Sequence, residues 1–233
     1  PPRSTLSSSS AASDVYKRQV MTIPYNATKD SSRKYIRESL LEEGIDPTKD
    51  ELTQIVNAVY NSMDSIVPGP MQVMRWIKKH VGQYIRNGAT AVEWVTPSGF
   101  IVNQRRDDIE TMRMELQLLG RTSIRLPTGN TTPSPNKHKS STAPNYIHSF
   151  DASILHRSFN QFNEPFTVIH DSVLCRAGDM GTLNRLVRET YANIFSEEDW
   201  LSKFAKTINA SEPPPIVGTL NPKDVSNSTY FFC

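Results

Sequence analysis

Cysteine is scarce in this chain, which has only two among its 233 residues, Cys175 and Cys233. Two thiols cannot build the disulfide framework of a small secreted domain, so we expect a reducing compartment. No apolar run approaches the roughly 20 residues that a membrane-spanning helix needs, which excludes a spanning protein. The first 13 residues are rich in serine and have no apolar core, so no secretory signal is predicted.

A strong excess of one charge is also missing. The chain has 26 lysines and arginines against 24 aspartates and glutamates, a formal net charge of +2. This balance permits a nucleic-acid partner without requiring one. Hydrophobic residues make up 37% and charged residues 21%. The hydrophobic share is below the usual ~45–50%, although glycine is left out of this count, and the composition is still that of a globular chain with a core.

Several site signatures are absent as well. The sequence has no cysteine and histidine spacing typical of a metal site, no phosphate-binding GxxxxGK[ST] loop and no GxSxG nucleophile elbow. Cys175 stands in no context typical of a nucleophile, and we interpret it as a small hydrophobic residue on a strand.

The periodicity of apolar residues predicts an α+β fold. Helical spacing over residues 30–43, 48–65 and 71–87 predicts three helices, and alternation predicts a hairpin over 91–103 and a charged ribbon over 112–126. Further along we expect a polar loop over residues 128–142, a helix over 145–162 and a second hairpin over 166–175. A pair of helices over 181–207, a proline-rich linker over 210–222 and an aromatic tail over 226–233 are expected to follow.

The most suggestive local feature is the segment FTVIHDSVLC, residues 166–175. A buried apolar strand is expected to run directly into His170 and Asp171, and a carboxylate at such a position is costly unless its charge is compensated. A Mg²⁺ ion would compensate it, because Mg²⁺ prefers carboxylate oxygens. An aspartate that only turns a hairpin is the other interpretation of this segment, and from these residues alone both stay open.

Asp171 and its neighbours resemble motif C of the phage-type single-subunit DNA-directed RNA polymerases, a family of phage, mitochondrial and some plastid enzymes. Four further segments resemble this family in the same order. They are VMTIPY at 20–25 with Lys17 and Arg18 before it (motif B), WVTPSGF at 94–100, APNYIHSFD at 143–151 and YFFC at 230–233. The likeness runs from about residue 17 to the last residue, and five motifs in order are a specific match.

The resemblance implies the carboxyl-terminal part of a right-hand polymerase, with fingers helices, a β-ribbon and the palm's motif C hairpin. It divides the chain into five segments. Residues 1–19 are a low-complexity or non-native leader, residues 20–90 are fingers helices with motif B, and residues 91–143 are β-hairpins with the specificity ribbon and a basic loop. Residues 144–209 are palm elements with motif C, and residues 210–233 are a linker with an aromatic tail.

The resemblance also assigns roles by matching position. Asp171 would be a catalytic aspartate that binds Mg²⁺, and Lys17 would contact the triphosphate. Tyr25 would help to select ribose over deoxyribose, since a phenol offers both a ring face and a polar tip. Met21 and His170 would lie near the nucleotide. His148 would donate a hydrogen bond to the minor groove or to a 2′-hydroxyl.

The ribbon over residues 112–126 falls where the family has its promoter-specificity hairpin. A two-stranded ribbon fits the major groove of DNA, where arginine reads guanine edges. Arg113 and Glu115 share one face of the alternating pattern, and Arg125 lies on the return strand. These three residues are the expected DNA contacts. An exposed hairpin with ordinary surface charges is the alternative interpretation.

The chain departs from the family pattern at Asn26, where the family usually has glycine. The family's first catalytic aspartate, in motif A, lies upstream of motif B, so we expect a truncated polymerase that does not polymerise alone. The implied partners are a DNA template and promoter, nascent RNA, ribonucleoside triphosphates and the missing amino-terminal part of the polymerase. The implied location is the cytoplasm of a host if the source is viral, or alternatively the mitochondrion.

Two other functions stay open from the sequence. One is a fragment of a family A DNA polymerase, although those enzymes usually have glutamate where this chain has Ser172. The other is a non-catalytic nucleic-acid-binding module that uses basic residues of the ribbon and of the loop after it, namely Arg113, Arg121, Arg125 and Lys137 to Lys139. This module predicts salt-dependent DNA binding that survives the loss of Asp171.

Overall fold

The computed structural model describes residues 22–23, 27–116, 122–170, 172–216 and 218–231. The described residues form two compact units. Unit 1 lies within residues 22–76 and includes 215–216 and 218, and unit 2 lies within residues 77–214 and 219–231. Helices and three two-stranded antiparallel sheets make up these residues, so the predicted α+β class is confirmed.

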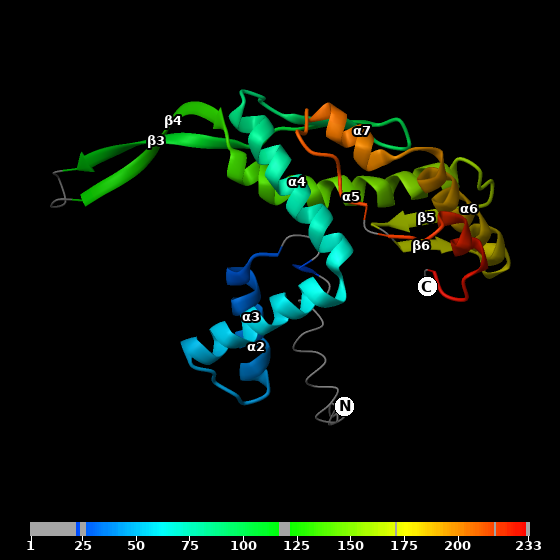
Figure 1. Cartoon of the computed structure of the whole chain (residues 1–233), viewed down its shortest axis with the longest axis horizontal. Helices are drawn as coiled ribbons and strands as arrows, with labels where there is room; N and C mark the ends of the chain where they lie inside the picture. Colours follow the sequence, from blue (N-terminus) through cyan, green and yellow to red (C-terminus); the bar gives the residue numbers. More distant parts are fainter. Residues whose placement is uncertain (1–21, 24–26, 117–121, 171, 217, 232–233) are drawn as a thin grey trace. The chain divides into compact units, whose positions relative to one another are not determined.

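Unit 1 contains a pair of helices, α2 (Lys29–Glu42) and α3 (Lys49–Ile66), that lie side by side in Figure 1. The two helices bury a small apolar core of Ile36, Leu52 and Val56. Burial of each such side chain contributes about 1.5–3 kcal/mol, which holds the pair together.

The starts of these helices follow from their capping residues. The Thr28 hydroxyl accepts the N–H of Ser31 at the start of α2, so the cap lies two residues before the expected Asp30. Thr48 starts α3, as predicted, and forms a reciprocal capping box with Glu51. The hydrogen bonds from Thr48 lower the pKa of the Glu51 carboxyl.

The helix α4 (Pro68–Arg86) begins three residues earlier than predicted. The sequence VPGP at residues 67–70 was expected to be a break, but only Val67 separates α3 from α4. Proline is tolerated here because the first N–H groups of a helix have no intrahelical partner. Of the five residues predicted to face inward from this helix, Tyr84 is only partly buried and the other four are buried: Met74, Ile77, Val81 and Ile85.

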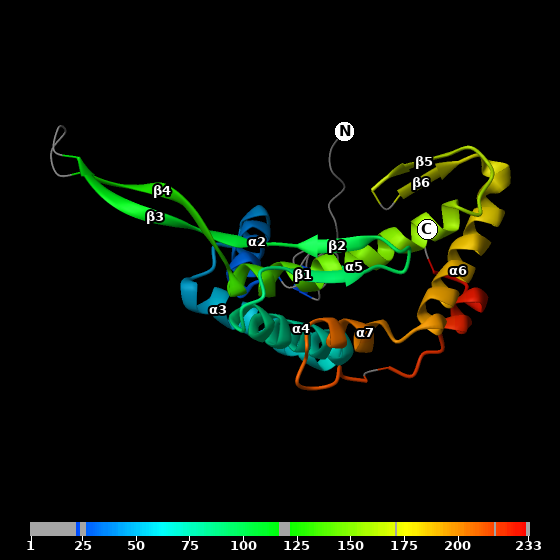
Figure 2. The ribbon, with the colours of Figure 1, turned by 90° about the horizontal axis from the view of Figure 1, so that it is seen from above.

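The centre of unit 2 is a hairpin, β1 (Val92–Val95) and β2 (Ile101–Gln104), that runs along the helix α5 (Pro135–Phe159) in Figure 2. Trp94 of β1 packs edge-on against Tyr146 and Phe204, at centroid distances of 5.8 and 6.2 Å. Its indole N–H donates to the Ser149 hydroxyl at 3.0 Å. This aromatic contact fixes the hairpin on the helix.

The segment expected to be a polar loop, residues 128–142, is instead strand and helix. β3 (Asp107–Leu116) pairs with β4 (Thr122–Pro133), and α5 begins two residues after β4. Ser134 caps α5 by accepting the N–H of Lys137, with proline in the first turn. Pro144 lies inside the helix, where burial of Ala143 and Tyr146 offsets the lost hydrogen bond. Turn-forming residues therefore misled the prediction.

The remaining elements of unit 2 follow α5. β5 (Phe166–Ile169) and β6 (Ser172–Cys175) form the predicted second hairpin, and a short 3-10 helix, η2 (Ala177–Asp179), leads into α6 (Met180–Glu197). The helix α7 (Trp200–Thr207) is capped by Asp199. The described residues after α7 form no further helix or strand before η3 (Pro222–Asn227), which lies against α6.

Candidate functional site

An open pocket of about 490 Å³ lies between the β1–β2 hairpin and α5. Its lining includes His148, the histidine predicted to contact the nascent base pair, together with Arg105 and Arg106 at the end of β2. His148 is exposed on α5, and Asn145 and Ser149 lie three residues before it and one after, on neighbouring positions of the helix. The pocket is thus lined by a histidine, three amides, a hydroxyl and two guanidinium groups.

A chain of amide hydrogen bonds joins β2 to α5 beside this pocket. The buried Gln104 accepts from the Asn145 side chain at 2.6 Å and donates to the Thr142 hydroxyl at 2.7 Å. Because a buried amide left without partners costs about 1–3 kcal/mol, this network sets the position of the hairpin relative to His148. Sequence reasoning missed Gln104 and Asn145. The only available signal was the place of Asn145 one helical turn before His148.

The ribbon starts directly after this pocket. His138 is fully buried, and its Nε2 accepts the backbone N–H of Arg106 at 3.2 Å while Nδ1 lies 2.8 Å from the Ser134 carbonyl oxygen. Nδ1 therefore carries the proton and donates it to that carbonyl. His138 is thus a structural residue, which corrects its place in the expected basic loop.

Lys137 also has a structural contact at this base. Its ammonium group donates to the Asp107 carbonyl oxygen at 2.6 Å and lies 2.9 Å from the Asp108 carboxylate. Hydrogen bonds from Ser134 and then Lys137 lower the pKa of the Asp108 carboxyl. The base of the ribbon is thereby tied to the start of α5.

The ribbon of β3 and β4 projects away from α5 in both views (Figures 1 and 2). Arg113 lies directly opposite Arg125 in the register, and Glu115 lies two residues further on β3, so all three side chains share a face. The Arg113 guanidinium is 4.0 Å from the Glu115 carboxylate, and both side chains are about two-thirds exposed, 67% and 64%. This exposed ion pair is weak and leaves most of the positive charge on the face.

The hairpin of β5 and β6 carries the predicted motif C. Ile169 lies opposite Ser172, which leaves His170 and Asp171 between the paired strands. His170 has a φ of 58°, in the left-handed region that side chains other than glycine seldom adopt and that two-residue hairpin turns require. β5 is exposed along its whole length, so the expectation of a buried strand before His170 is wrong.

A second pocket, of about 700 Å³, lies between this hairpin, α5 and the turn of the β1–β2 hairpin. It is lined by His170 and by apolar residues that include Phe159 and Phe166, whose rings stack at a centroid distance of 4.2 Å. Ala152 of this lining lies one helical turn after His148 on α5. His148 and His170 therefore border neighbouring pockets along the same helix.

The other predicted site residues lie outside the described part of the chain. These are Lys17, Met21, Tyr25 and Asp171, together with Arg121 of the alternative DNA-binding module. Among residues that the structure describes, no group of three or more acidic, histidine or cysteine side chains could hold a metal ion. Within the same residues, no helix is long and apolar enough to cross a membrane.

Comparison with known proteins identifies the family. A family profile described as DNA-dependent RNA polymerase matches residues 10–213. T7 RNA polymerase of Escherichia phage T7 is 28% identical over an alignment of 256 positions, and this alignment covers 94% of this chain and 29% of the relative. The mitochondrial DNA-directed RNA polymerase of Homo sapiens is 26% identical, with 94% and 20% covered, and DNA-directed RNA polymerase 2A of Nicotiana tabacum is 26% identical, with 93% and 68% covered.

The chain therefore belongs to the DNA-dependent RNA polymerase family, which confirms the prediction from its motifs. It spans 28–29% of the length of the T7, K11 and T3 phage relatives.

Proposed function

We propose that this chain is the carboxyl-terminal part of a phage-type single-subunit DNA-directed RNA polymerase, with the fingers helices, the ribbon and the last palm elements of a right-hand fold. The complete enzyme transfers nucleotides from ribonucleoside triphosphates to the 3′-end of RNA on a DNA template. The family match over residues 10–213, together with the motif C sequence around Asp171, carries the proposal. The enzyme would work in a host cytoplasm or, alternatively, in a mitochondrion.

Asp171 is the residue of this chain that would hold Mg²⁺. The sequence supports this role, because His170 and Ser172 flank the carboxylate as in the family's motif C, and Mg²⁺ prefers carboxylate oxygens. A single carboxylate is an incomplete site for the two-metal mechanism, so another aspartate must come from the upstream part of the polymerase. When bound, the metal ions would activate the 3′-hydroxyl and stabilise the leaving pyrophosphate.

The nucleotide would be held by residues of both predicted motifs. Lys17 would contact the triphosphate, Met21 would lie against the nucleotide, and Tyr25 would select ribose. His148 would donate to the minor groove or the 2′-hydroxyl, which its exposed place beside an open pocket supports. His170 would orient the neighbouring aspartate.

We propose that the charged face of the ribbon reads the promoter. Like charges directly opposite each other destabilise a strand pair. Glu115 only partly neutralises the opposed Arg113 and Arg125, and binding to phosphate or to guanine edges would relieve the remaining repulsion between the two arginines. We expect that replacing both arginines by glutamine lowers promoter-directed initiation by the complete enzyme at least tenfold, because each bidentate contact gives about 1–3 kcal/mol of base discrimination. Gel-based run-off transcription measures initiation.

The control for the ribbon is elongation from a preassembled RNA–DNA scaffold without a promoter, which should change less than twofold. An equal loss in both assays would contradict promoter reading and would assign the arginines to general nucleic-acid binding.

The proposed activity is tested by comparing two purified proteins, the polymerase with its upstream sequence restored and the 233-residue chain. We expect the first to extend RNA with ribonucleotides in preference to deoxyribonucleotides. We expect the second to make no RNA, because its phage relatives are more than three times as long. Preference for deoxyribonucleotides would favour a family A DNA polymerase, and RNA synthesis by the short chain would overturn the expected inactivity.

A further inference from the structure

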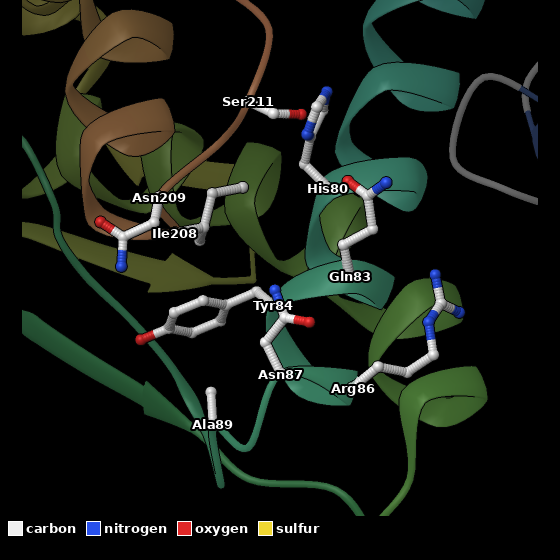
Figure 3. A pocket seen from close by; sticks show the side chains of 9 residues that line it. All are labelled: His80, Gln83, Tyr84, Arg86, Asn87, Ala89, Ile208, Asn209 and Ser211. Atoms are coloured by element: carbon white, nitrogen blue, oxygen red, sulfur yellow. The ribbon is translucent and has the colours of Figure 1, made fainter.

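A pocket of about 420 Å³ lies in unit 2 where the end of α4 meets the residues that follow α7 (Figure 3). Its lining does not include His148, His170 or a residue of the ribbon. Gln83, Tyr84, Arg86 and Asn87 approach it from the α4 side, and Ile208 and Asn209 approach it from the α7 side. A pocket of this volume is in the usual range for small organic ligands.

Five of the polar side chains that line this pocket are not engaged by the described part of the protein. Within the described part of the chain, the side chains of Gln83, Tyr84, Arg86, Asn87 and Asn209 make no hydrogen bond or ion pair. Arg86 therefore differs from arginines such as Arg75 and Arg157, which contact carboxylates at 2.7 and 2.8 Å. Three amides, a phenol and a guanidinium without an ion pair therefore line this pocket.

The ends of both helices are capped by the backbone that follows them. The N–H groups of residues 87–89 bind carbonyl oxygens of α4, and those of residues 208–210 bind carbonyl oxygens of α7. Asn209 adopts a φ of 49°, a left-handed conformation that directs the chain away from α7.

The apolar part of the lining consists of the Tyr84 ring, the buried Ile208 and Ala89. A flat aromatic ring among amides is the combination by which proteins hold unpaired bases, which stack on the ring while amides bond the base edge. Arg86 is exposed at the rim, where a guanidinium suits a single phosphate.

We infer that this pocket binds one unpaired nucleotide, with the base stacked on Tyr84, the base edge hydrogen-bonded to Asn87 and Asn209, and the phosphate on Arg86. The inference rests on the proposed function, since a polymerase meets single-stranded nucleic acid outside its catalytic groups. The ligand chemistry is that of a nucleoside monophosphate unit, either in a strand or free in solution.

The test measures binding by the purified 233-residue chain, not RNA synthesis. The probes are fluorescein-labelled U12 RNA, followed by anisotropy, and the same RNA with one 2-aminopurine, whose fluorescence falls on stacking. The protein background carries Arg113→Gln and Arg125→Gln, so that the ribbon does not dominate binding. Circular dichroism melting confirms that each variant is folded.

We expect Tyr84→Ala to weaken U12 binding about tenfold and to abolish the 2-aminopurine quenching, because base stacking is worth a factor of roughly 5–150. Tyr84→Phe keeps the ring and should stay within twofold. Asn209→Gly keeps the left-handed backbone, removes the amide and should cost about threefold. Arg86→Gln should reduce the slope of log affinity against log salt by about 0.7, the value for one phosphate of a single strand.

Arg185→Gln is the matched control, because Arg185 is an exposed arginine of α6 outside the pocket, and we expect no change. Competition by UMP at the same nucleotide concentration would assign the pocket to free nucleotides, and competition by U12 alone would assign it to a strand. Equal U12 affinity of the Tyr84→Ala and parent proteins would overturn the inference. A loss of duplex DNA affinity in Tyr84→Ala as large as its loss of U12 affinity would also overturn it. Neither result would affect the proposed polymerase activity.

Discussion

Replacement of Asp171 by asparagine is expected to reduce RNA synthesis by the complete polymerase about 10³-fold or more. Asparagine keeps the size of the side chain and removes the negative charge that would hold Mg²⁺. Metal ions contribute several kcal/mol of transition-state stabilisation in phosphoryl transfer, and about 4 kcal/mol corresponds to a factor of 10³. Single-nucleotide extension of a primed RNA–DNA scaffold measures the rate directly.

The design of this experiment separates catalysis from folding and binding. Asp224→Asn removes an exposed carboxylate of η3 and should leave extension within twofold. Scaffold affinity should also stay within about threefold in Asp171→Asn. An unchanged extension rate would refute the metal role, and a complete enzyme that binds DNA but never extends RNA, even with Asp171 intact, would favour the non-catalytic binding module.

Replacement of Arg188 by alanine is expected to lower the free energy of unfolding by about 3 kcal/mol. Arg188 of α6 is nearly buried, at 9% exposure, and donates to the Val225 and Ser228 carbonyl oxygens at 2.8 and 2.6 Å and to the Asn184 amide oxygen at 2.7 Å. Its guanidinium also lies 5.6 Å from the Phe231 ring centroid. Removal leaves several acceptors without a donor, at about 1–3 kcal/mol for each buried one.

Urea unfolding of the 233-residue chain measures this loss, and limited proteolysis should show earlier cleavage after η3. Arg185→Ala, one turn earlier on α6, is the matched control, because Arg185 forms only an exposed ion pair with Glu189 and should change stability by less than 1 kcal/mol. Arg188→Lys should be intermediate, since lysine cannot reproduce the fork of donors. Equal stability of the two alanine variants would show that the tail is not held by Arg188.

The contribution of Arg188 shows what periodicity cannot supply. The tail was recognised as a family-like aromatic end, but the residue that holds it lies about 40 positions earlier, within an ordinary amphipathic helix. Nothing in the spacing of a single arginine distinguishes a buried carbonyl-binding role from an exposed ion pair such as that of Arg185. Only the packing of η3 on α6 separates the two.

By itself, the sequence determined the family, the helices α2 and α3, the two hairpins of unit 2 and the ribbon with Arg113 and Glu115 on one face. Local signals suffice for these features, because capping boxes, alternation and motif order depend on residues close together in the chain. Tertiary structure alone decided that residues 128–142 become strand and helix and that Gln104 joins Asn145 beside His148. The physical reason is burial: hydrogen bonds and packing between distant segments outweigh local turn preferences, and these partners cannot be read from neighbouring residues.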